Sequence, residues 1–244
     1  MARKPARGLF ITGTDTGIGK TYVAALVARA LVAGGHRVGV YKPAASGCSD
    51  YGNGPVSDDA LTLWQAAGSP GTLAEVCPQV FAAPLAPHLA AAAEGRRLDA
   101  ALLRRGLEVW LERSEIVLIE GAGGLMSPLG ADEYVADLAY DFGFPLLVVA
   151  RNGLGVINHV LQTLITAATF RDGLSVAGIV LNEAVPPAGD VSIEHNAREI
   201  RGRAVPPVLA EVGYGADRFD PSVDWFAVSA EALPPAGPVE DGTP

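Results

Sequence analysis

The chain has 244 residues, of which 49% are hydrophobic, and carries a formal net charge of −9. This length and composition fit one large α/β domain with a sizeable core. An acidic chain without a basic cluster is a poor partner for nucleic acid or an anionic membrane. No apolar run reaches the ~18 residues of a membrane span, and the apolar segment near the start is too short for a signal peptide. We therefore expect a cytoplasmic protein with its two cysteines, Cys48 and Cys77, reduced.

Apolar runs alternate with helical patterns along the chain, and this alternation predicts the fold. The expected strands are 9–14, 38–42, 116–120, 146–150, 176–182 and 208–212. The expected helices are 20–33, 58–67, 99–112, 134–142, 158–171 and 191–202. Such an order predicts a single doubly wound α/β domain over residues 1–230, with a mostly parallel sheet and helices on both faces. Residues 231–244 are rich in Pro, Gly and Ala and are expected to form a disordered tail.

Residues 9–21 carry the most informative pattern, Leu-Phe-Ile-Thr-Gly-Thr-Asp-Thr-Gly-Ile-Gly-Lys-Thr. An apolar strand, a glycine-rich turn ending in Gly-Lys-Thr and a helix together predict a P-loop, which binds nucleotide phosphates through backbone N–H groups. Lys20 would reach the β- and γ-phosphates, and the Thr21 hydroxyl would ligate Mg²⁺. The early glycine is Gly13 rather than residue 14, so the loop is one residue longer than the common pattern.

Acidic residues near the predicted strand ends could supply the rest of a Mg²⁺ site. Glu120 ends an apolar strand and precedes Gly-Ala-Gly-Gly, a place where P-loop proteins hold the metal. Asp58 and Asp59 begin a predicted helix, where acids also cap the first turn. One of the two could cap while the other binds metal, so Thr21, Asp59 and Glu120 form a plausible ligand set. The alternatives are a solvated strand end for Glu120 and helix capping for both aspartates.

Three further features indicate anion or base recognition. Lys42 ends the second strand, where a dinucleotide-binding domain usually has an acid, so it favours a second anionic group over NAD. Residues 153–159 open a helix whose free N–H groups can bind a carboxylate or phosphate, although Asn158 could simply cap that helix. Asn182 ends another strand, where its amide could contact adenine.

At this point the chain resembles the dethiobiotin synthetase family. The motifs that carry the resemblance are Thr-Gly-Thr-Asp-Thr-Gly-Ile-Gly-Lys-Thr (12–21), Tyr-Lys-Pro-Ala-Ala-Ser-Gly (41–47), Ser-Asp-Asp-Ala-Leu (57–61), Ala-Pro-His (86–88), Glu-Gly-Ala-Gly-Gly (120–124), Ser-Pro-Leu (127–129) and Gly-Val-Ile-Asn-His (155–159). They cover roughly residues 8–215 in the family's order. The resemblance implies a homodimeric, ATP- and Mg²⁺-dependent ligase that converts 7,8-diaminopelargonic acid and CO₂ to dethiobiotin.

The resemblance also implies roles for individual residues. Lys20 and Lys42 would be catalytic, stabilising the transferred phosphoryl group and the carbamate. Thr21, Asp59 and Glu120 would hold Mg²⁺. The substrate would contact Ser46 and, from the partner subunit, Gly155, Val156 and Asn158. The nucleotide would contact Gly17, Ile18, Gly19, Lys20, Thr21, Tyr22, Asp59, Glu120, Gly121, Ala122, Gly123, Asn182, Glu183, Gly213, Tyr214 and Gly215.

Two other families share this fold branch. Dimeric ATPase switches of the partition and division-site type carry an extra lysine early in the P-loop, where this chain has Asp15 and Thr16. Amidotransferase-type ligases acting on larger metabolites usually add a glutaminase domain, for which this chain is too short. The switch ATPase is the alternative to the ligase.

Overall fold

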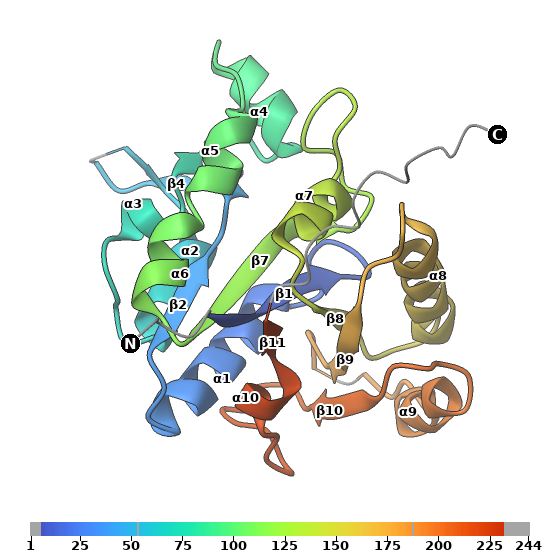
Figure 1. The fold of residues 1–244 in the computed structure, drawn as a ribbon. Coiled ribbons are helices and arrows are strands. Elements are labelled where there is room, and N and C mark those ends of the chain that lie inside the picture. Colours follow the sequence, from blue (N-terminus) through green and yellow to red (C-terminus); the bar gives the residue numbers. More distant parts are fainter. Residues whose placement is uncertain (1–5, 53, 187, 232–244) are drawn as a thin grey trace, which may run out of the picture.

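A computed structural model describes residues 6–52, 54–186 and 188–231. Its main sheet has six parallel strands, and a short antiparallel strand joins it beside the first (Figure 1). The parallel strands lie in the order β10 (Val208–Val212), β9 (Val176–Asn182), β8 (Leu146–Arg151), β1 (Arg7–Gly13), β7 (Ile116–Gly124) and β2 (Val38–Tyr41). The antiparallel strand is β11 (Ala230–Glu231), which pairs with the start of β1.

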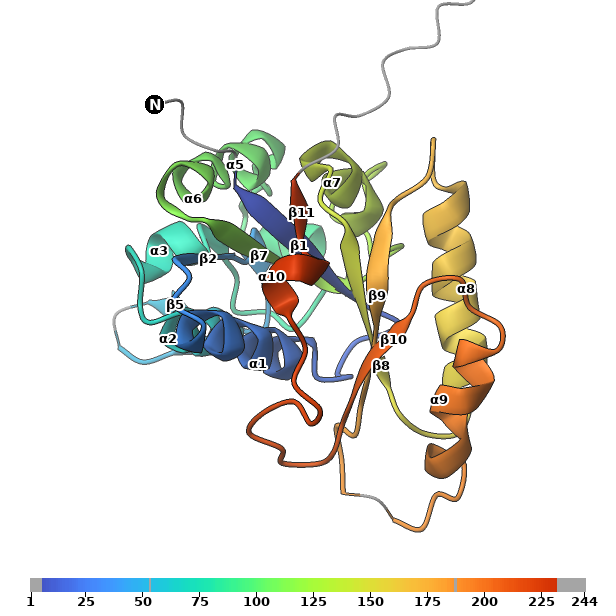
Figure 2. The same cartoon turned by 60° about the horizontal axis from the view of Figure 1, so that its bottom comes forward.

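Helices cover both faces of this sheet, as Figure 2 shows for its β1–β7–β2 half. Helices α1 (Lys20–Ala33) and α2 (Asp58–Ala66) lie on one side. Helices α5 (Ala100–Arg105), α6 (Glu108–Arg113) and α7 (Val135–Phe142) lie on the other. Helices α8 (Val156–Thr169) and α9 (Ile193–Arg201) flank β8, β9 and β10. The doubly wound α/β fold is thereby confirmed.

The continuous apolar strands follow from this two-sided cover. Five of the six residues of β8 are buried, and six of the seven in β1. Charged residues inside such a layer are costly unless they are paired. Lys42 and Glu120 are nevertheless almost fully buried, Lys42 directly after β2, which ends one residue earlier than expected, and Glu120 within β7. These two buried charges indicate that a functional site lies near β2 and β7.

The chain order places a crevice at β1. From β1 the chain crosses to β2 on one side, returns to β7, and then passes to β8 on the opposite side of β1. Ligands of open α/β sheets bind at the carboxyl ends of the strands where the order reverses in this way. The loop after β1 lies at that point.

Two predicted elements differ from the structure by more than a shift of one or two residues at their ends. The helix expected at 99–112 is divided into α5 and α6 where the Tyr41 hydroxyl donates to the carbonyl of Leu103, and a Cβ on nearby Gly106 would lie 2.3 Å from this hydroxyl. The strand expected to end at Glu120 continues to Gly124, which pairs with Gly13 past an irregularity in the β1–β7 register. Glu120 therefore lies inside a strand and not at its end.

Several short elements have no counterpart in the sequence-based expectation. They are β3 (Ala44–Ala45), β4 (Ser49–Asp50), β5 (Pro55–Val56), β6 (Gln79–Val80), α3 (Leu73–Val76), α4 (Pro87–Ala93) and α10 (Trp225–Val228). Strand β11 includes residue 231, the first of the expected tail, and residues 232–244 lie outside the described part of the chain. Among the described residues, no helix has the length and apolar character that crossing a membrane requires.

Candidate functional site

The loop between β1 and α1 has the backbone of a phosphate cradle. Gly17 and Gly19 have φ values of +72° and +86°, in the left-handed region that favours glycine. Gly19 is the N-cap of α1, so the first N–H groups of the helix face the crevice without a side-chain cap. Lys20 follows at once, and its Nζ donates to the carbonyl of Asp15 across the loop at 3.3 Å.

The carboxylate of Glu120, on the neighbouring strand β7, accepts hydrogen bonds from one ammonium and one hydroxyl beside this loop. Oε1 of Glu120 accepts from Nζ of Lys42 at 2.6 Å and from Oγ1 of Thr21 at 2.9 Å. Nζ of Lys42 also lies 3.0 Å from Oδ2 of Asp59. Strand pairing between β2 and β7 brings Lys42 next to Glu120, and the N-terminal end of α2 brings Asp59. Four predicted site residues thus form one cluster.

The electrostatics of the cluster follow from burial and charge pairing. Burial alone would lower the pKa of Lys42, but the adjacent carboxylates of Glu120 and Asp59 outweigh it and raise that pKa above its ordinary value. Burial lowers the pKa of Lys20, and the charge of Glu120 only partly opposes this. Burial opposes ionisation of Asp59, yet Lys42 holds the pKa of this carboxyl below its ordinary value. Lys42 is therefore a permanent cation near neutral pH.

A cavity of about 390 Å³ opens onto this cluster. Its lining includes both lysines, both carboxylates and Ser46. The full set is Thr16, Gly17, Gly19, Lys20, Thr21, Lys42, Ala44, Ala45, Ser46, Asp59, Glu120, Ala122 and Gly123. We call it the phosphate pocket.

The donors in the phosphate pocket fit Mg²⁺ bound together with a nucleotide. Oε2 of Glu120 is buried and has no hydrogen-bond partner, so one oxygen of this carboxylate is left for a cation. Mg²⁺ is usually held by one or two carboxylates, with phosphate oxygens and waters completing its shell. The described residues contain no cluster of three or more His, Cys, Asp or Glu able to hold a metal by themselves.

The two adjacent aspartates face different partners. Asp59 faces Lys42 in the phosphate pocket. Asp58 instead accepts from the Tyr51 hydroxyl at 2.7 Å and from Ser49 Oγ at 3.4 Å. Ser57 is the residue that caps α2, through a bond from the backbone N–H of Ala60. Of the two aspartates, geometry therefore favours Asp59 as the metal ligand.

The residues predicted to contact the nucleotide base also come together. Nδ2 of Asn182 donates to the carbonyl of Ile18 at 2.9 Å, while its Oδ1 is buried without a partner. Glu183 accepts from the backbone N–H of Tyr214 at 3.4 Å. The Tyr22 hydroxyl donates to the carbonyl of Ala216. The end of β9, the start of α1 and the loop 213–216 thus form one wall beside the P-loop.

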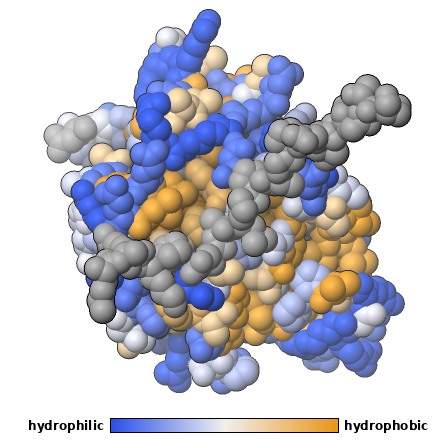
Figure 3. Space-filling model, viewed as in Figure 1, coloured by the Kyte–Doolittle hydropathy of each residue, from blue (hydrophilic) through white to orange (hydrophobic). Residues whose placement is uncertain are grey.

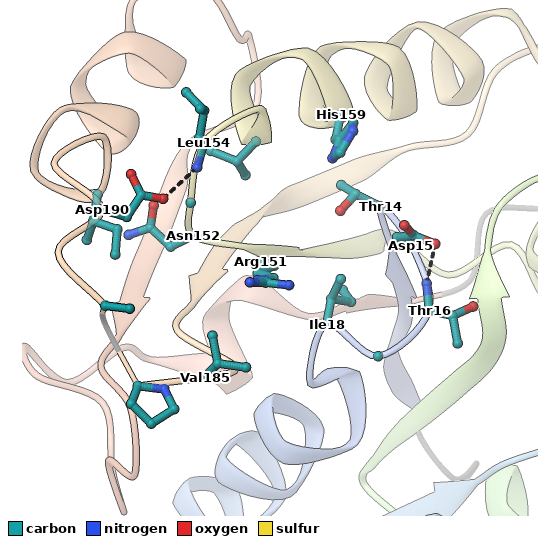
Figure 4. Close-up of a pocket in the computed structure, with 16 residues that line it drawn as sticks. Thr14, Asp15, Thr16, Ile18, Arg151, Asn152, Leu154, His159, Val185 and Asp190 are labelled. Carbon is teal, nitrogen blue, oxygen red and sulfur yellow. Dashed lines mark hydrogen bonds between the residues drawn. The ribbon is translucent and has the colours of Figure 1, made fainter.

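On the other side of the P-loop lies a second cavity of about 430 Å³, drawn in Figure 4. Thr14, Asp15 and Ile18 line it from the loop, and Arg151 lines it from the end of β8. The turn before α8 forms a further wall, where the N–H of Leu154 donates to Asp190 at 2.8 Å (Figure 4). We call it the α8 pocket.

The predicted substrate contacts are divided between these two cavities. Ser46 lines the phosphate pocket and Val156 lines the α8 pocket. Gly155 is the N-cap of α8, in the left-handed conformation with φ of +95°. Asn158 is the third helical residue and exposed, so it does not cap this helix. Ser46 and Val156 thus line different cavities, which share Thr16 and Gly17, and Gly155 and Asn158 line neither of the two.

Gly121 is also predicted to contact the nucleotide, and the structure shows it packed closely against the core. A Cβ at this position would meet Val135 at 2.8 Å and Phe10 at 3.1 Å, so the residue serves close packing in the core. Sequence reasoning also missed several residues around the two pockets. Arg151 and the buried pair Asn152 and Asn196, joined by a 2.9 Å hydrogen bond, are examples. The sequence did offer a signal for Arg151, because this residue is a cation that directly follows the apolar run 146–150.

Comparison with known proteins agrees with this geometry. A family model described as "AAA domain" matches residues 7–219. The chain is 44% identical over 214 residues to "ATP-dependent dethiobiotin synthetase BioD" of Rhodopirellula baltica, covering 83% of this chain and 82% of the relative. It is 50% identical over 195 residues to the protein of the same name from Anaeromyxobacter dehalogenans, covering 80% and 84%.

Among solved structures, pNOB8 ParA bound to nonspecific DNA matches with a TM-score of 0.53 and 12% identity, over 86% of each chain. At that identity the likeness shows a shared fold alone, so it does not support the switch ATPase alternative. Identity is far higher for the synthetases, 44% and 50% against 12%, at similar coverage. The chain belongs to the ATP-dependent dethiobiotin synthetase family and is an ATP-dependent ligase.

Proposed function

We propose that the phosphate pocket binds Mg²⁺-ATP and 7,8-diaminopelargonic acid with CO₂, and closes the ureido ring of dethiobiotin. The observation that carries the proposal is the placement of Lys42. Its buried ammonium lies beside the P-loop lysine in the same cavity, where an acceptor anion would meet the γ-phosphate. This second cation directly follows β2, whereas the extra lysine of the switch ATPases lies early in the P-loop.

The reaction has three steps, each of which needs charge stabilisation. One amine of the substrate attacks CO₂ and loses a proton, giving a carbamate. A carbamate oxygen then attacks the γ-phosphorus of ATP, and ADP leaves. Finally the second amine attacks the carbonyl carbon of this mixed anhydride, inorganic phosphate leaves, and the ring closes. Negative charge develops on the oxygen atoms of the carbamate and of the transferred phosphoryl group, so fixed cations are a main catalytic need, while each attacking amine loses a proton.

The residues of the pocket supply those cations. Lys20 neutralises charge on the transferred phosphoryl group, and Lys42 stabilises the carbamate and its phosphorylated form. Thr21, Asp59 and Glu120 would hold Mg²⁺, which would supply further charge neutralisation at the phosphates of ATP. Ser46, at the same cavity, contacts the acceptor. These roles remain predictions from the family resemblance, supported by the shared cavity.

The test is a complete reaction mixture of protein, ATP, Mg²⁺, bicarbonate and the diamine. We expect dethiobiotin to form with one ADP per ring, and ADP release to depend on the diamine. ATP turnover that is independent of the diamine, without ring product, would contradict the proposal. Omitting bicarbonate from CO₂-free buffer is the control, since carbamate formation then stops.

A homodimer would join the two halves of the substrate site. The N-terminal end of α8 in a second copy would then face the acceptor in the phosphate pocket and bind its carboxylate. Helix α8 supports this arrangement, because only Val156, Val160 and Ala167 of its residues are buried. Ile165 is 63% exposed and Leu154, just before the helix, 88%. Figure 3 shows hydrophobic residues gathered over α8 on the right-hand side.

Light scattering tests the dimer. The wild type should elute with twice the mass of one chain, and Ile165→Glu should shift it to one chain with unchanged circular dichroism. A cytoplasmic location, with small-molecule partners and without nucleic acid or membrane, completes the proposal. It is supported by the net charge of −9 and by two free, buried cysteines, and cell fractionation tests it.

A further inference from the structure

The ammonium of Lys42 lies between the two carboxylates that we expect to bind Mg²⁺. Its Nζ is 2.6 Å from Oε1 of Glu120 and 3.0 Å from Oδ2 of Asp59. The side chains of Lys42 and Glu120 are 5% and 1% exposed, so solvent screens this pair very little. In this arrangement the lysine is the counter-ion of the metal site.

The two oxygens of Glu120 are used unequally. Oε1 accepts from both Lys42 and Thr21, whereas Oε2 is buried and accepts from nothing. A divalent cation at Oε2 would share one small carboxylate with the ammonium. Two cations this close repel strongly in a buried site, and their mutual repulsion exceeds that of exposed charges. The lysine and the metal therefore compete for the charge of Glu120 and Asp59.

We propose that Mg²⁺ entering with the nucleotide displaces the Lys42 ammonium from Glu120 and Asp59 and releases it toward the acceptor side of the phosphate pocket. The proposal rests on the proposed function, since it uses the Mg²⁺ site described there. The displaced ammonium can stay within the phosphate pocket, because Ser46 and the alanines of β3 line the same cavity. Metal loading and assembly of the acceptor site then occur together.

Reciprocity follows from this exchange. If the metal draws Lys42 away from the carboxylates, an acceptor anion that holds Lys42 must strengthen metal binding by the same factor. Before the metal arrives, the lysine is neutralised by its carboxylates and cannot stabilise a carbamate. The protein thereby limits carbamate activation to the state that carries Mg²⁺-ATP.

The first experiment measures Mn²⁺ binding by electron paramagnetic resonance at pH 8, with saturating ADP. We compare the wild type with Lys42→Met, which keeps the length of the side chain without its charge. Removing a competing cation should lower the dissociation constant for Mn²⁺ by about tenfold or more. Arg151→Met is the matched control: it also removes one cation close to the P-loop, but at the α8 pocket, and should change that constant less than about twofold.

The second measurement avoids any folding defect of the variant, because it uses the wild type. In protein labelled with ¹⁵N-lysine, the Lys42 ammonium is identified by its loss in Lys42→Met. Its signal should shift when Mg²⁺ is added to the ADP complex, and Lys42→Met should show no other lost signal. Equal Mn²⁺ affinities in wild type and Lys42→Met, or a Lys42 signal that Mg²⁺ leaves in place, would overturn the exchange while leaving the ligase intact. A wild type that binds no Mn²⁺ with ADP overturns both the exchange and the metal site of the proposed function.

Discussion

Asn182 fastens the end of β9 to the P-loop through the 2.9 Å hydrogen bond from its Nδ2 to the carbonyl of Ile18. The contact leaves little room at the neighbouring glycine. A Cβ on Gly19 would lie 2.2 Å from the same Nδ2. The amide is thus held with its free Oδ1 buried beside the predicted base site. We expect nucleotide binding to depend on this fit between the two segments.

Gly19→Ala should therefore abolish nucleotide binding. The substitution combines a left-handed backbone, which costs a residue with a Cβ about 1–2 kcal/mol, with a direct clash against Asn182. We expect ADP affinity to fall at least about 100-fold. Gly17→Ala is the matched control, because it has a similar positive φ but no atom within 4 Å of the added Cβ. Its loss should stay near tenfold, measured by calorimetry. Equal losses in the two variants would show that the Asn182 contact is unimportant.

Asn182 should also select the base. Its free Oδ1 can accept from the 6-amino group of adenine but not from a 6-keto group, which carries an acceptor at that place. We expect the wild type to bind ATP about ten- to a hundredfold more tightly than ITP. Asn182→Ala should weaken ATP binding and bring the two affinities within about threefold. An unchanged preference for ATP in the variant would show that the base binds elsewhere.

The elements that sequence predicted best are those with a strong local signal. The P-loop helix begins at Lys20 and β9 and β10 match their predicted ranges, because a glycine turn or a continuous apolar run defines each. The break between α5 and α6 could not be predicted in this way. It depends on Tyr41, whose hydroxyl donates to the carbonyl of Leu103, 62 residues later in the chain.

In the candidate site, too, local patterns could be predicted from the sequence, whereas contacts between distant residues could not. Each member of the charged cluster carried its own local pattern, so Lys42 and Glu120 were predicted for separate roles. Their direct contact spans 78 residues and exists because β2 pairs with β7. No local pattern reports which strands are neighbours in a parallel sheet. The hydrogen bond between Asn152 and Asn196 beside the α8 pocket was missed for a similar reason, since it spans 44 residues.

Substitutions of Asp59 and Asp58 should have clearly different effects on metal affinity. Asp59→Asn removes a carboxylate from the phosphate pocket and should weaken Mn²⁺ binding in the ADP complex by about tenfold or more. Asp58→Asn is the matched control, because its carboxylate holds Tyr51 and Ser49 instead. Its Mn²⁺ affinity should stay within about twofold of the wild type. The reverse ranking would assign the metal to Asp58.

Cys77 should be inert to thiol reagents in the folded protein. Burial raises the pKa of its thiol to about 12, so little thiolate exists at pH 8. The reaction with a chromogenic disulfide should be at least about 100-fold slower than in urea, where both cysteines of the chain react. Rapid reaction of the folded protein, with its circular dichroism intact, would contradict the buried position.

The same raised pKa makes stability depend on alkaline pH. Between about pH 8.5, the ordinary thiol value, and pH 12, the folded chain binds more protons at Cys77 than the unfolded chain. The free energy of unfolding must then fall as pH rises through this window. Lys42 and Tyr41 also have raised pKa values and act in the same direction. The contribution of Cys77 is therefore the difference between wild type and Cys77→Ala, whose urea midpoint should fall less steeply from pH 8.5 to 11.

Lys42→Ala should separate catalysis from nucleotide binding. The ammonium contacts Glu120 and Asp59, and none of its contacts is with the P-loop backbone. We therefore expect ADP affinity in EDTA to stay within about threefold of the wild type. Formation of the ring product should fall at least about a thousandfold, because the carbamate and its phosphorylated form lose their counter-charge.

The charge left behind requires a control for folding. Removing Lys42 leaves Glu120 buried without its cation, and breaking one side of a buried pair costs about 3–5 kcal/mol. Lys42→Ala,Glu120→Gln removes both charges and should recover most of that stability while staying inactive. Retained ADP binding in the single variant with lost ring closure assigns Lys42 to the acceptor. A matching loss of ADP affinity in both variants would instead place Lys42 in the nucleotide site, as a second buried cation that binds the phosphates. Ring closure would then need another source of positive charge.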